Sequence, residues 1–507
     1  MLLVFFPGLD FTVSLLACFK AGLIAVPVFP PDPRKMKKDL HHFVNIQLSC
    51  GASTVLTNSL YNFTKKIEGL KNMFSTESVR WPDLKWIVVD DVLKRGRLAA
   101  KATKSSGSIA PSIIATPERV AFLQYTSGST SDPKGVMITH RNLAHNLSLI
   151  MKELRADTHT INVSWLPQYH DMGLIGSYLG AMYCGGVGYY LSPISFLKDP
   201  VVWIKTMSQF RGTHTQAPNF AYALSSRKFK EAMKEEAFRS KVAASLDLSC
   251  LQHMINAAEP VDFHAIMDFY STFGAYGLPS DVIVPTYGLA EHTVFVCSGG
   301  KQVITVSKAS LEAAQVQVVG EVLALVGGSA EGASSSEEDV QRIVGCGYPG
   351  HGEGMRLVVV NSDATTSNAM GDGNTIALPD KAIGEIWVDS PSKALGYWNQ
   401  PDLSRQDFHA VLSNETSDRS FLRTGDLGFM YSGELFICGR SKDLIIVRGS
   451  NHYPQDIERT AEQALVDFVR AGCSAAFSVN GNKKRGTEDV AYIAEVALSI
   501  CNTYFDI

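Results

Sequence analysis

Between residues 139 and 157, apolar side chains recur at the three- and four-residue spacing of one helix face. They are Leu143, Leu147, Ile150, Met151 and Leu154, and this spacing predicts an amphipathic helix. The short apolar run at 120–123 predicts a strand ahead of it. The residues between them, 125–135, are mostly small, hydroxyl-bearing or glycine. The pattern therefore predicts a strand, a loop and a helix in this order.

Short apolar runs of strand length also mark the last part of the chain. They cover residues 435–438, 444–447, 475–479 and 490–498. After the second run, Tyr453-Pro454 is expected to open a helix from about 455 to 471, since proline suits the first helical turn. The polar residues 480–487 separate the last two runs and predict a turn.

Three polar segments predict connectors or solvated surface. Residues 94–116 are basic, then rich in Ser, Ala and Pro, and predict a linker before the strand at 120–123. Residues 327–339 (GGSAEGASSSEED) are small and acidic, a composition typical of a disordered loop. Residues 225–228 (SSRK) predict a solvated helix edge that takes no part in a binding pocket.

Composition bounds the class of protein. A chain of 507 residues with 45% apolar content can form about three structural units with large cores. The net charge of −4 and the pI near 6.4 give no electrostatic reason to expect a nucleic-acid partner.

Two further features concern the compartment. The nine cysteines form no CxxC pair, so the sequence suggests neither a zinc site nor a disulfide framework, and it favours a reducing, cytoplasmic location. The apolar stretch up to residue 27 is interrupted by Pro7, Asp10 and Lys20. No run therefore reaches the roughly 18–20 apolar residues of a transmembrane segment.

The loop at 125–135 has the residue types of a phosphate site. Hydroxyl-bearing residues and glycines leave backbone N–H groups open to an anion, and Lys134 adds a positive charge. The spacing GxxxxGK[ST] fails, because Pro133 follows Gly128 where the second glycine should stand. With Pro-Lys-Gly at its end, the run YTSGSTSDPKG closely resembles the ATP loop of the adenylate-forming superfamily. That superfamily comprises acyl-CoA synthetases, luciferases, peptide-synthetase adenylation domains and fatty acyl-AMP ligases.

Four later segments resemble further motifs of the superfamily, in its order. They are 256–260 (NAAEP), 286–291 (TYGLAE), 423–426 (RTGD) and 439–443 (GRSKD). Each is weak alone, because a buried tyrosine or a solvated Arg–Asp pair is the commoner explanation of such residues. Their order after the ATP loop makes the resemblance strong.

The resemblance implies ATP and Mg²⁺ as cofactors. It implies nucleotide-binding roles for Thr126, Ser127, Gly128, Ser129, Thr130, Lys134, Ala257, Ala258, Glu259, Tyr287, Gly288, Asp426 and Arg440. Glu291, with Thr126, would hold the magnesium ion, and Asp426 would accept the two ribose hydroxyls. Tyr287 would stack on adenine beside Ala257 and Ala258. Lys134, Glu291 and His170 are the expected catalytic residues, and Lys442 is the expected hinge.

Finer features resemble the fatty acyl-AMP ligase branch. They are residues 164–174 (SWLPQYHDMGL), residues 448–458 (RGSNHYPQDIE) and a long interval between Glu291 and Gly345. In that branch, an extra segment restrains the C-terminal domain and disfavours the CoA-dependent step. Residues 305–312 are expected to be its structured part. The alternative is a tolerated surface insertion.

His170 is open to two interpretations. The family places this segment beside the acyl carboxylate, where an imidazole would orient the substrate, and the alternative is a core histidine satisfied by the backbone. No second ligand lies at useful spacing for a metal. An acyl tunnel is expected between residues 170–176 and 212–218, where Gly173, Gly176 and Gly180 would leave room for a chain.

The resemblance also implies a fold and its boundaries. We expect the α/β adenylate-forming enzyme fold, with residues 1–439 forming two αβ subdomains and a small β-barrel, a hinge at 440–442 and a partial α+β domain at 443–507. The family's internal strand and helix correspond to residues 2–6 and 11–21. Several tens of residues would then be missing before them, and the sheet would lose a partner strand. No segment resembles the one that carries the family's C-terminal lysine.

The predicted function is the ATP-dependent activation of a fatty acid to acyl-adenylate with release of pyrophosphate. The activated acyl group is expected to pass to an acyl carrier protein or to enter polyketide or lipid synthesis. The alternatives are an acyl-CoA synthetase that completes thioester formation and a catalytically impaired acyl- or nucleotide-binding homologue, which the missing lysine makes credible.

Overall fold

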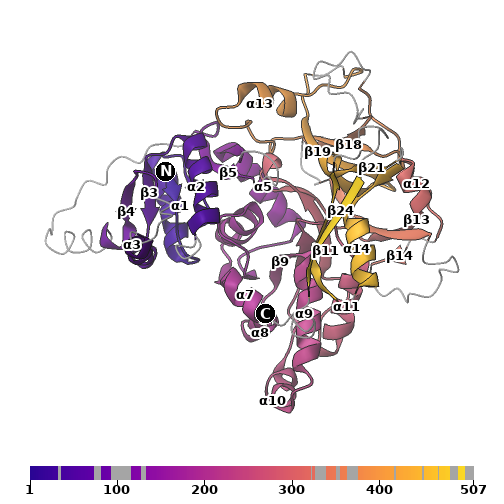
Figure 1. Cartoon of the computed structure of the whole chain (residues 1–507), viewed down its shortest axis with the longest axis horizontal. Helices are drawn as coiled ribbons and strands as arrows, with labels where there is room; N and C mark the ends of the chain where they lie inside the picture. The colour runs from indigo at the N-terminus through magenta and orange to yellow at the C-terminus, as the bar shows by residue number, and fades with distance from the viewer. Residues whose placement is uncertain are drawn as a thin grey trace. The chain divides into compact units, whose positions relative to one another are not determined.

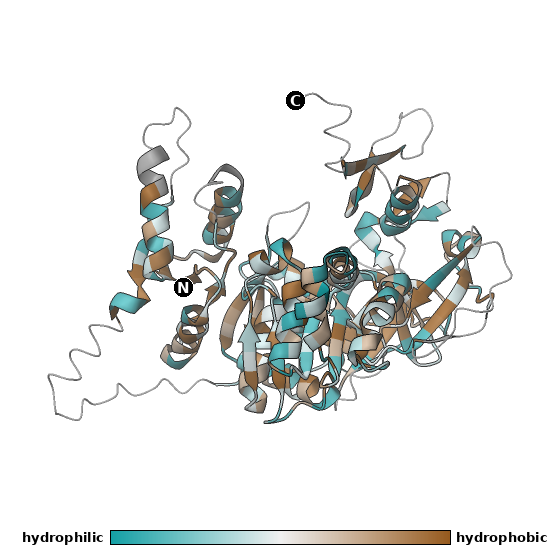
Figure 2. Cartoon of the chain, turned by 90° about the horizontal axis from the view of Figure 1, so that it is seen from below, coloured by the Kyte–Doolittle hydropathy of each residue, from teal (hydrophilic) through white to brown (hydrophobic). Residues whose placement is uncertain are grey.

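The computed structural model describes residues 1–31, 36–72, 81–92, 116–126, 133–320, 323–325, 339–349, 354–361, 375–415, 418–447, 450–465, 468–479 and 489–496 (Figure 1). The chain forms two compact units. The first comprises Met1–Gln216, Gly288–Phe295 and Ser390–Ala410, and the second comprises Ala217–Tyr287, Val296–Asp389 and Val411–Ile507. Within the described ranges, no helix is long and apolar enough to cross a membrane (Figure 2).

The first unit begins with a four-stranded parallel sheet in the order β2-β1-β3-β4. Its strands are β1 (Leu2–Leu3), β2 (Val26–Pro27), β3 (Thr54–Thr57) and β4 (Lys85–Val88). Parallel neighbours need crossover connections, and α1 (Leu9–Ala21), α2 (Met36–Cys50) and α3 (Ser59–Asn72) supply them. The strand and helix expected at 2–6 and 11–21 are confirmed. The lost partner strand is wrong for β1, which pairs with β2 on one side and β3 on the other.

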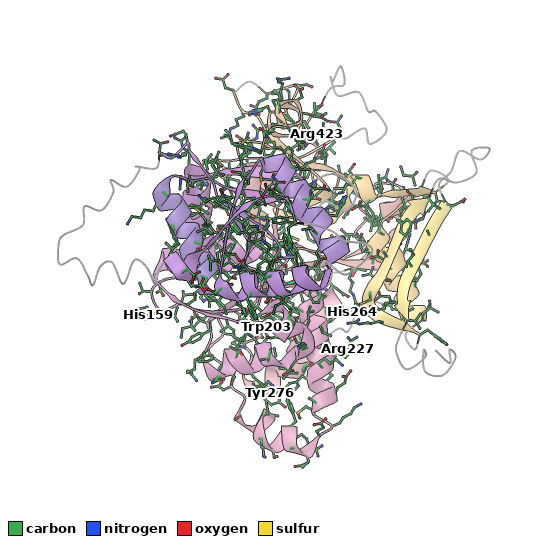
Figure 3. All side chains as sticks on the ribbon, turned by 60° about the vertical axis from the view of Figure 1, so that its left-hand side comes forward. His159, Trp203, Arg227, His264, Tyr276 and Arg423 are labelled. Atoms are coloured by element: carbon green, nitrogen blue, oxygen red, sulfur yellow. The ribbon has the colours of Figure 1, made fainter. Side chains whose placement is uncertain are left out.

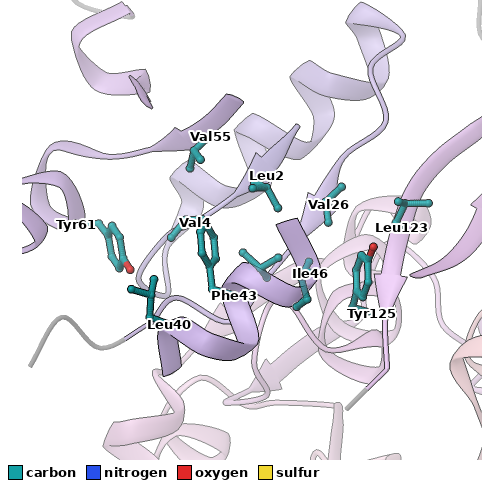
Figure 4. Close-up of a cluster of buried hydrophobic side chains, with 11 residues drawn as sticks. Leu2, Val4, Val26, Leu40, Phe43, Ile46, Val55, Tyr61, Leu123 and Tyr125 are labelled. Atoms are coloured by element: carbon teal, nitrogen blue, oxygen red, sulfur yellow. The ribbon is translucent and has the colours of Figure 1, made fainter. Parts of the chain in front are cut away.

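A buried cluster holds this sheet to its helices (Figure 4). Leu40, Phe43 and Ile46 of α2 pack in one cluster with Leu2 of β1. These four side chains are at most 2% exposed. Burying a side chain of this size contributes roughly 1.5–3 kcal/mol.

The expected order of strand, loop and helix needs one correction. The strand β5 (Val120–Tyr125) is followed after the loop by a second strand, β6 (Gly135–Thr139), and only then by α5 (His140–Glu153). The two strands form an antiparallel pair, with Leu123 opposite Met137 and Tyr125 opposite Gly135. Residues 126–134 therefore connect the two strands of a hairpin, and the helix begins only after the second strand.

Further elements of the first unit follow α5. The strands are β7 (Ile161–Ser164), β8 (Val187–Tyr190) and β9 (His214–Pro218), and β7 pairs in parallel with the other two. The helices are the π-helix η1 (Met172–Leu179), α6 (Gly180–Cys184), α7 (Pro193–Lys198) and α8 (Val201–Gln209). Trp203 of α8, labelled in Figure 3, is fully buried, and its Nε1 donates to Thr215 Oγ1 at 3.0 Å. α8 is thereby fixed to β9.

In the second unit, β10 (His253–Ala257) pairs in parallel with β11 (Ile283–Gly288), and α9 (Asn219–Ala232) packs on α11 (Phe263–Phe273). The remaining pieces of this region are α10 (Glu236–Lys241), η2 (Ala243–Ser245), η3 (Gly274–Tyr276), β12 (Phe295–Ser298) and β16 (Tyr348–Pro349). The solvated edge expected at 225–228 is half wrong. Arg227, labelled in Figure 3, and Lys228 are exposed, but Ser225 and Ser226 are fully buried on α9 because they face the packed side of the helix.

The rest of the second unit is antiparallel. One sheet has the order β17-β18-β19-β20, formed by β17 (Arg356–Val360), β18 (Gly384–Asp389), β19 (Leu422–Tyr431) and β20 (Glu434–Arg440). A second sheet joins β13 (Gln302–Ser307) to β14 (Leu323–Ala324) and β15 (Val340–Val344), with α12 (Lys308–Glu312) after β13. The strand expected at 435–438 and the structured part expected at 305–312 are therefore confirmed. Residues 327–338 lie outside the described residues.

The last elements are β21 (Ile445–Val447), β22 (Ser450–His452), α14 (Pro454–Ala464), β23 (Val469–Val479) and β24 (Asp489–Val496). The strands expected at 444–447, 475–479 and 490–498 are confirmed in type. The helix expected to reach residue 471 ends at Ala464, because Val469 already begins a strand paired with Val496. The turn expected at 480–487, nearly all of the linker expected at 94–116 and the last eleven residues lie outside the described ranges.

We expect Thr139→Ala to lower the free energy of unfolding by about 0.5–2 kcal/mol, the usual effect of losing an N-cap hydroxyl. Thr139 Oγ1 accepts from Asn142 N–H at 3.1 Å, and Asn142 Oδ1 accepts from Thr139 N–H at 3.0 Å. Urea unfolding followed by circular dichroism measures the change. Thr139→Ser keeps the hydroxyl and is the control. Equal stability of the alanine variant and the wild type would contradict the capping role.

Candidate active site

The two strands of the hairpin bring the two ends of the loop of small residues together. Thr126 N–H donates to the Lys134 carbonyl at 3.2 Å, so these two predicted site residues lie opposite each other. A Cβ at Gly135 would lie 2.9 Å from the ring of Tyr125, so a larger residue at the last hairpin pair would have to displace that ring. The other predicted loop residues, Ser127, Gly128, Ser129 and Thr130, lie outside the described residues.

Lys134 and Glu291 meet on one tyrosine that the sequence analysis missed. Tyr397 is 5% exposed, and its hydroxyl donates to Glu291 Oε1 at 3.0 Å. The Lys134 Nζ lies 4.7 Å from the centroid of the same ring, within cation–π range. Burial, and next the Glu291 charge, raise the pKa of Tyr397, so the phenol stays protonated and donates.

A short backbone pairing fixes this tyrosine beside the hairpin. Residue 397 bridges Val136 in antiparallel fashion, and Trp398 N–H donates to the Gly135 carbonyl at 2.8 Å. The Tyr397 N–H donates to Ser404 Oγ at 2.8 Å. No sequence signal identified Tyr397, because its partner Glu291 is 106 residues away and a buried aromatic is typical of any core.

The loop that carries Glu291 is anchored by buried polar groups. His292 is fully buried, with Nδ1 2.8 Å from the Phe295 carbonyl oxygen and Nε2 2.6 Å from Ser390 Oγ. Burial lowers the pKa of His292 to about 4, so the ring is neutral near pH 7. Thr293 follows with φ +68°, a left-handed conformation that costs on the order of 1–3 kcal/mol outside glycine. This strain persists because its neighbours over-determine the loop.

Asn146 of α5 connects the same loop to the hairpin. Its Nδ2 donates to the Phe295 carbonyl and to Ser392 Oγ, both at 3.0 Å, and its Oδ1 accepts from Phe295 N–H at 3.1 Å. The side chain is fully buried. Because α5 starts directly after β6, the amide fixes the loop of Glu291 relative to the hairpin of Lys134.

His170 fits neither sequence interpretation fully. It is no buried core histidine, since its side chain is 49% exposed, and its Nδ1 pairs with Asp171 Oδ1 at 2.7 Å rather than with the backbone. The Asp171 charge raises the pKa of His170 against the opposing effect of burial. Asp171 also accepts from Met172 N–H at 2.6 Å and caps η1. An orienting role toward a substrate carboxylate stays a prediction.

The glycines expected to leave room for an acyl chain are packed by protein atoms instead. A Cβ at Gly173 would lie 2.2 Å from the Pro167 carbonyl oxygen, and one at Gly176 would lie 2.3 Å from Gln216 Oε1. At Gly180 the nearest atom would be Met151 Cε at 3.3 Å. The expectation is therefore wrong for Gly173 and Gly176, because these small residues allow close packing of η1.

The second unit brings the predicted ribose and adenine residues together. The Tyr287 hydroxyl donates to Asp426 Oδ2 at 2.6 Å, and Arg440 Nε lies 3.5 Å from Asp426 Oδ1. Burial raises the pKa of Asp426, and the Tyr287 hydrogen bond and the Arg440 charge oppose that shift. The pairing follows from register, since Asp426 lies opposite Arg440 across β19 and β20.

A buried carboxylate outside the predicted motifs holds the segment before Asp426. Glu385 is 5% exposed. Its Oε2 accepts from the Arg423 guanidinium at 3.1 Å, and its Oε1 accepts from Gly425 N–H at 3.2 Å (Figure 3 labels Arg423). Gly425 has φ +71°, which favours glycine. The RTGD segment is therefore an irregular part of β19, where the register with β18 shifts, and one glutamate holds it.

The NAAEP segment has a strained backbone angle directly after the end of β10. Ala257 is buried, and Ala258 has φ +71°, which is uncommon for alanine. Glu259 Oε1 accepts from Phe220 N–H and so pairs with a main-chain donor in the first turn of α9. This contact is a structural reason for Glu259 beside its predicted nucleotide role.

Gly288, which follows Tyr287, is required by packing. A Cβ there would lie 1.7 Å from the Val294 carbonyl oxygen. At the predicted hinge, Lys442 lies in the 3₁₀ turn η5 (Ser441–Asp443) and is exposed. The hinge and the domain boundaries around it stay predictions.

The long interval after Glu291 packs against the segment that follows this hinge. Tyr453 shares a buried cluster with Ile304, Leu311 and Ile343. The Gln341 Nε2 donates to Asp456 Oδ1 at 2.8 Å, and His452 Nδ1 lies 3.5 Å from Glu312 Oε1. A merely tolerated insertion has no need of such contacts.

Comparison with known proteins decides the family. The profile of a family described as AMP-binding enzyme matches residues 2–398. The chain belongs to the AMP-binding enzyme family. The match contains the hairpin with Lys134 and the loop with Glu291, and it ends just after Tyr397.

Individual relatives agree with the branch that the motifs indicated. The chain is 37% identical to the medium-chain fatty acid–[acyl-carrier-protein] ligase JamA of Moorena producens, covering 99% of this chain and 76% of the relative. It is 32% identical to the long-chain fatty acid–AMP ligase FadD32 of Mycolicibacterium smegmatis, covering 94% and 70%. A Legionella pneumophila fatty acyl-adenylate ligase, solved with acyl adenylate and pyrophosphate, superposes with a TM-score of 0.71 at 31% identity, covering 98% and 76%.

These similarities confirm the resemblance and the α/β adenylate-forming fold. They do not assign roles to single residues of this AMP-binding enzyme, so those roles stay predictions. Among the described residues, no group of three or more His, Cys, Asp or Glu side chains is arranged to hold a metal ion. Any metal at Glu291 would therefore need further oxygen ligands from elsewhere.

For this AMP-binding enzyme, we expect the pKa of His170, measured by NMR titration, to exceed its ordinary value of 6.5. Asp171→Asn should bring that pKa down to 6.5 or below, since the neutral amide still caps η1 but leaves only burial to act on the imidazole.

The free energy of unfolding should depend on pH through the same pair, His170 and Asp171. Its contribution is fully present between the unfolded pKa values of Asp171 and His170, and it is lost as pH rises through the raised value of His170. The stability difference between wild type and Asp171→Asn should therefore shrink from pH 6 to pH 9. The same His170 pKa in both proteins would contradict the pairing.

Proposed function

We propose that this chain activates a fatty acid by adenylation. A carboxylate oxygen of the fatty acid forms a bond to the α-phosphorus of ATP, the bond from that phosphorus to the bridging oxygen breaks, and pyrophosphate leaves. The observation that carries the proposal is the placement of the Lys134 ammonium and the Glu291 carboxylate on one buried tyrosine. The fatty acid ligases among the relatives support the substrate class.

The two opposite charges fit a polyphosphate and its counter-ion. Lys134 would neutralise phosphate charge next to the loop N–H groups of residues 127–130. The Glu291 carboxylate and the Thr126 hydroxyl are oxygen ligands, which Mg²⁺ prefers, and nucleotide sites often use one or two carboxylates plus the phosphates. A bound Mg²⁺ would supply charge neutralisation on the phosphate oxygens.

The second unit supplies nucleotide recognition in this proposal. Asp426 would accept the ribose hydroxyls, with Arg440 beside it, and Tyr287 would present its ring to adenine next to Ala257 and Ala258. The hydrogen bond between Tyr287 and Asp426 and the strain at Ala258 support these assignments. His170 would orient the acyl carboxylate, supported by its exposure and its pairing with Asp171.

We propose an acyl carrier protein as acceptor of the acyl group. Two observations support it: the name of the Moorena producens relative, and the contacts of residues 302–344 with residues 452–456, which tie down the segment after the hinge. A tied C-terminal segment disfavours the rearrangement for a CoA-dependent step. A cytoplasmic location is also part of the proposal and rests on the cysteine pattern of the sequence.

The test is to incubate the protein with ATP, Mg²⁺ and a panel of fatty acids, with CoA, with an acyl carrier protein, or with neither. We expect acyl-adenylate and pyrophosphate in all three, and acyl transfer to the carrier protein only. Glu291→Ala should abolish adenylate formation while keeping the wild-type circular dichroism spectrum.

Other products would decide between the alternatives. Acyl-CoA formed as fast as the adenylate would replace the proposal by a thioester-forming synthetase. Nucleotide binding without any adenylate would replace it by a non-catalytic binding homologue.

Asp426→Ala should weaken ATP binding by about 1.5–3 kcal/mol, the usual value of hydrogen bonds to a charged group. Isothermal titration calorimetry measures it. The matched control is Tyr287→Phe, which removes the hydrogen bond to Asp426 but keeps the ring and the carboxylate. We expect the control to retain most of the affinity. Unaltered ATP binding by Asp426→Ala would take Asp426 out of the site.

A further inference from the structure

We propose that Tyr397 is a positioning residue of this site, which holds the Glu291 carboxylate for the metal ion and the Lys134 ammonium for the phosphates through two different parts of one side chain. The inference rests on the proposed function and adds a residue to it. Its basis is the contact of one buried tyrosine with two charged residues of opposite sign.

The hydroxyl end acts on the carboxylate. Tyr397 donates to Glu291 Oε1 at 3.0 Å and takes up one acceptor position of that oxygen. An ionised carboxylate has about four such positions, and this donor restricts how the carboxylate can turn. A second link holds the main chain, since Ala394 N–H donates to the Glu291 carbonyl at 2.9 Å.

The ring face acts on the ammonium. Lys134 Nζ lies 4.7 Å from the ring centroid, where the negative face of the ring attracts a cation. This contact limits the reach of a long, flexible side chain without using its three N–H donors. The donors therefore stay available to phosphate oxygens.

The tyrosine itself is held rigidly, as a positioning residue must be. Its N–H donates to Ser404 Oγ at 2.8 Å, and its ring lies edge-on to Phe408 at 5.0 Å. Gly396 before it has φ +136°, and a Cβ there would lie 2.8 Å from Ser404 Oγ. Backbone pairing with Val136 completes the support. A residue placed only to fill the core would not need its hydroxyl at a carboxylate.

The test separates the two ends of the side chain. Tyr397→Phe keeps the ring and removes the hydroxyl. We expect it to weaken Mn²⁺ binding in the presence of α,β-methylene-ATP by about 10- to 100-fold, the usual effect of losing a partner behind a metal ligand. Electron paramagnetic resonance of free Mn²⁺ measures this without turnover. Analogue binding in EDTA should be unchanged in Tyr397→Phe and weakened in Tyr397→Leu, which also lacks the ring.

The matched control is Tyr61→Phe. Tyr61 is also buried in the first unit, and its hydroxyl donates to the Pro31 carbonyl at 2.8 Å, so its loss has a comparable effect on packing. We expect thermal stability to fall in both phenylalanine variants and Mn²⁺ affinity to fall only in Tyr397→Phe.

Two outcomes would overturn the inference. Wild-type Mn²⁺ affinity in Tyr397→Phe would reduce Tyr397 to a core residue and leave the proposed function standing. A wild-type chain without nucleotide-dependent Mn²⁺ binding would remove the inference together with the metal role of Glu291. A wild-type chain that binds Mn²⁺ and analogue but forms no acyl-adenylate would contradict the proposed function alone, and the Mn²⁺ comparison would still decide the role of Tyr397.

Discussion

The buried amide of Asn146 is the contact on which the geometry of the first unit depends. It satisfies both backbone groups of Phe295 and reaches Ser392, and it stands on a helix that begins where β6 ends. Unpaired, any of these buried groups would cost about 1–3 kcal/mol, so the set has one favourable arrangement. That arrangement fixes the distance between the hairpin of Lys134 and the loop of Glu291. The strained turn at Thr293 is tolerated because this network over-determines it.

In the second unit, the main constraint is the burial of one carboxylate, that of Asp426. Asp426 is largely buried, and a buried charge needs hydrogen bonds or a partner of opposite sign. Tyr287 and Arg440 provide both, while Glu385 holds the irregular part of β19 directly before Asp426. The same desolvation that makes this carboxylate costly also strengthens any hydrogen bond that a polar ligand makes to it.

The sequence predicted the motif residues well because glycines, charges and their spacing are local signals. The hairpin neck and the pair of Tyr287 with Asp426 both join residues that these motifs named. It missed β6, because five residues are too few to show a strand period next to a strongly periodic helix. It missed Tyr397 and Glu385, whose roles come only from partners far away in the chain. It misjudged Gly173, Gly176, Ser225 and Ser226, because small residues are compatible both with open space and with close packing.

The neck of the hairpin has a consequence for change in this protein. Thr126 and Lys134 face each other across a backbone hydrogen bond, so the anchor of the lysine is set by the two strands rather than by the connection between them. The two strands therefore hold the cation beside its tyrosine independently of residues 127–130. A change in the predicted phosphate loop would act on phosphate binding and would leave this anchor in place.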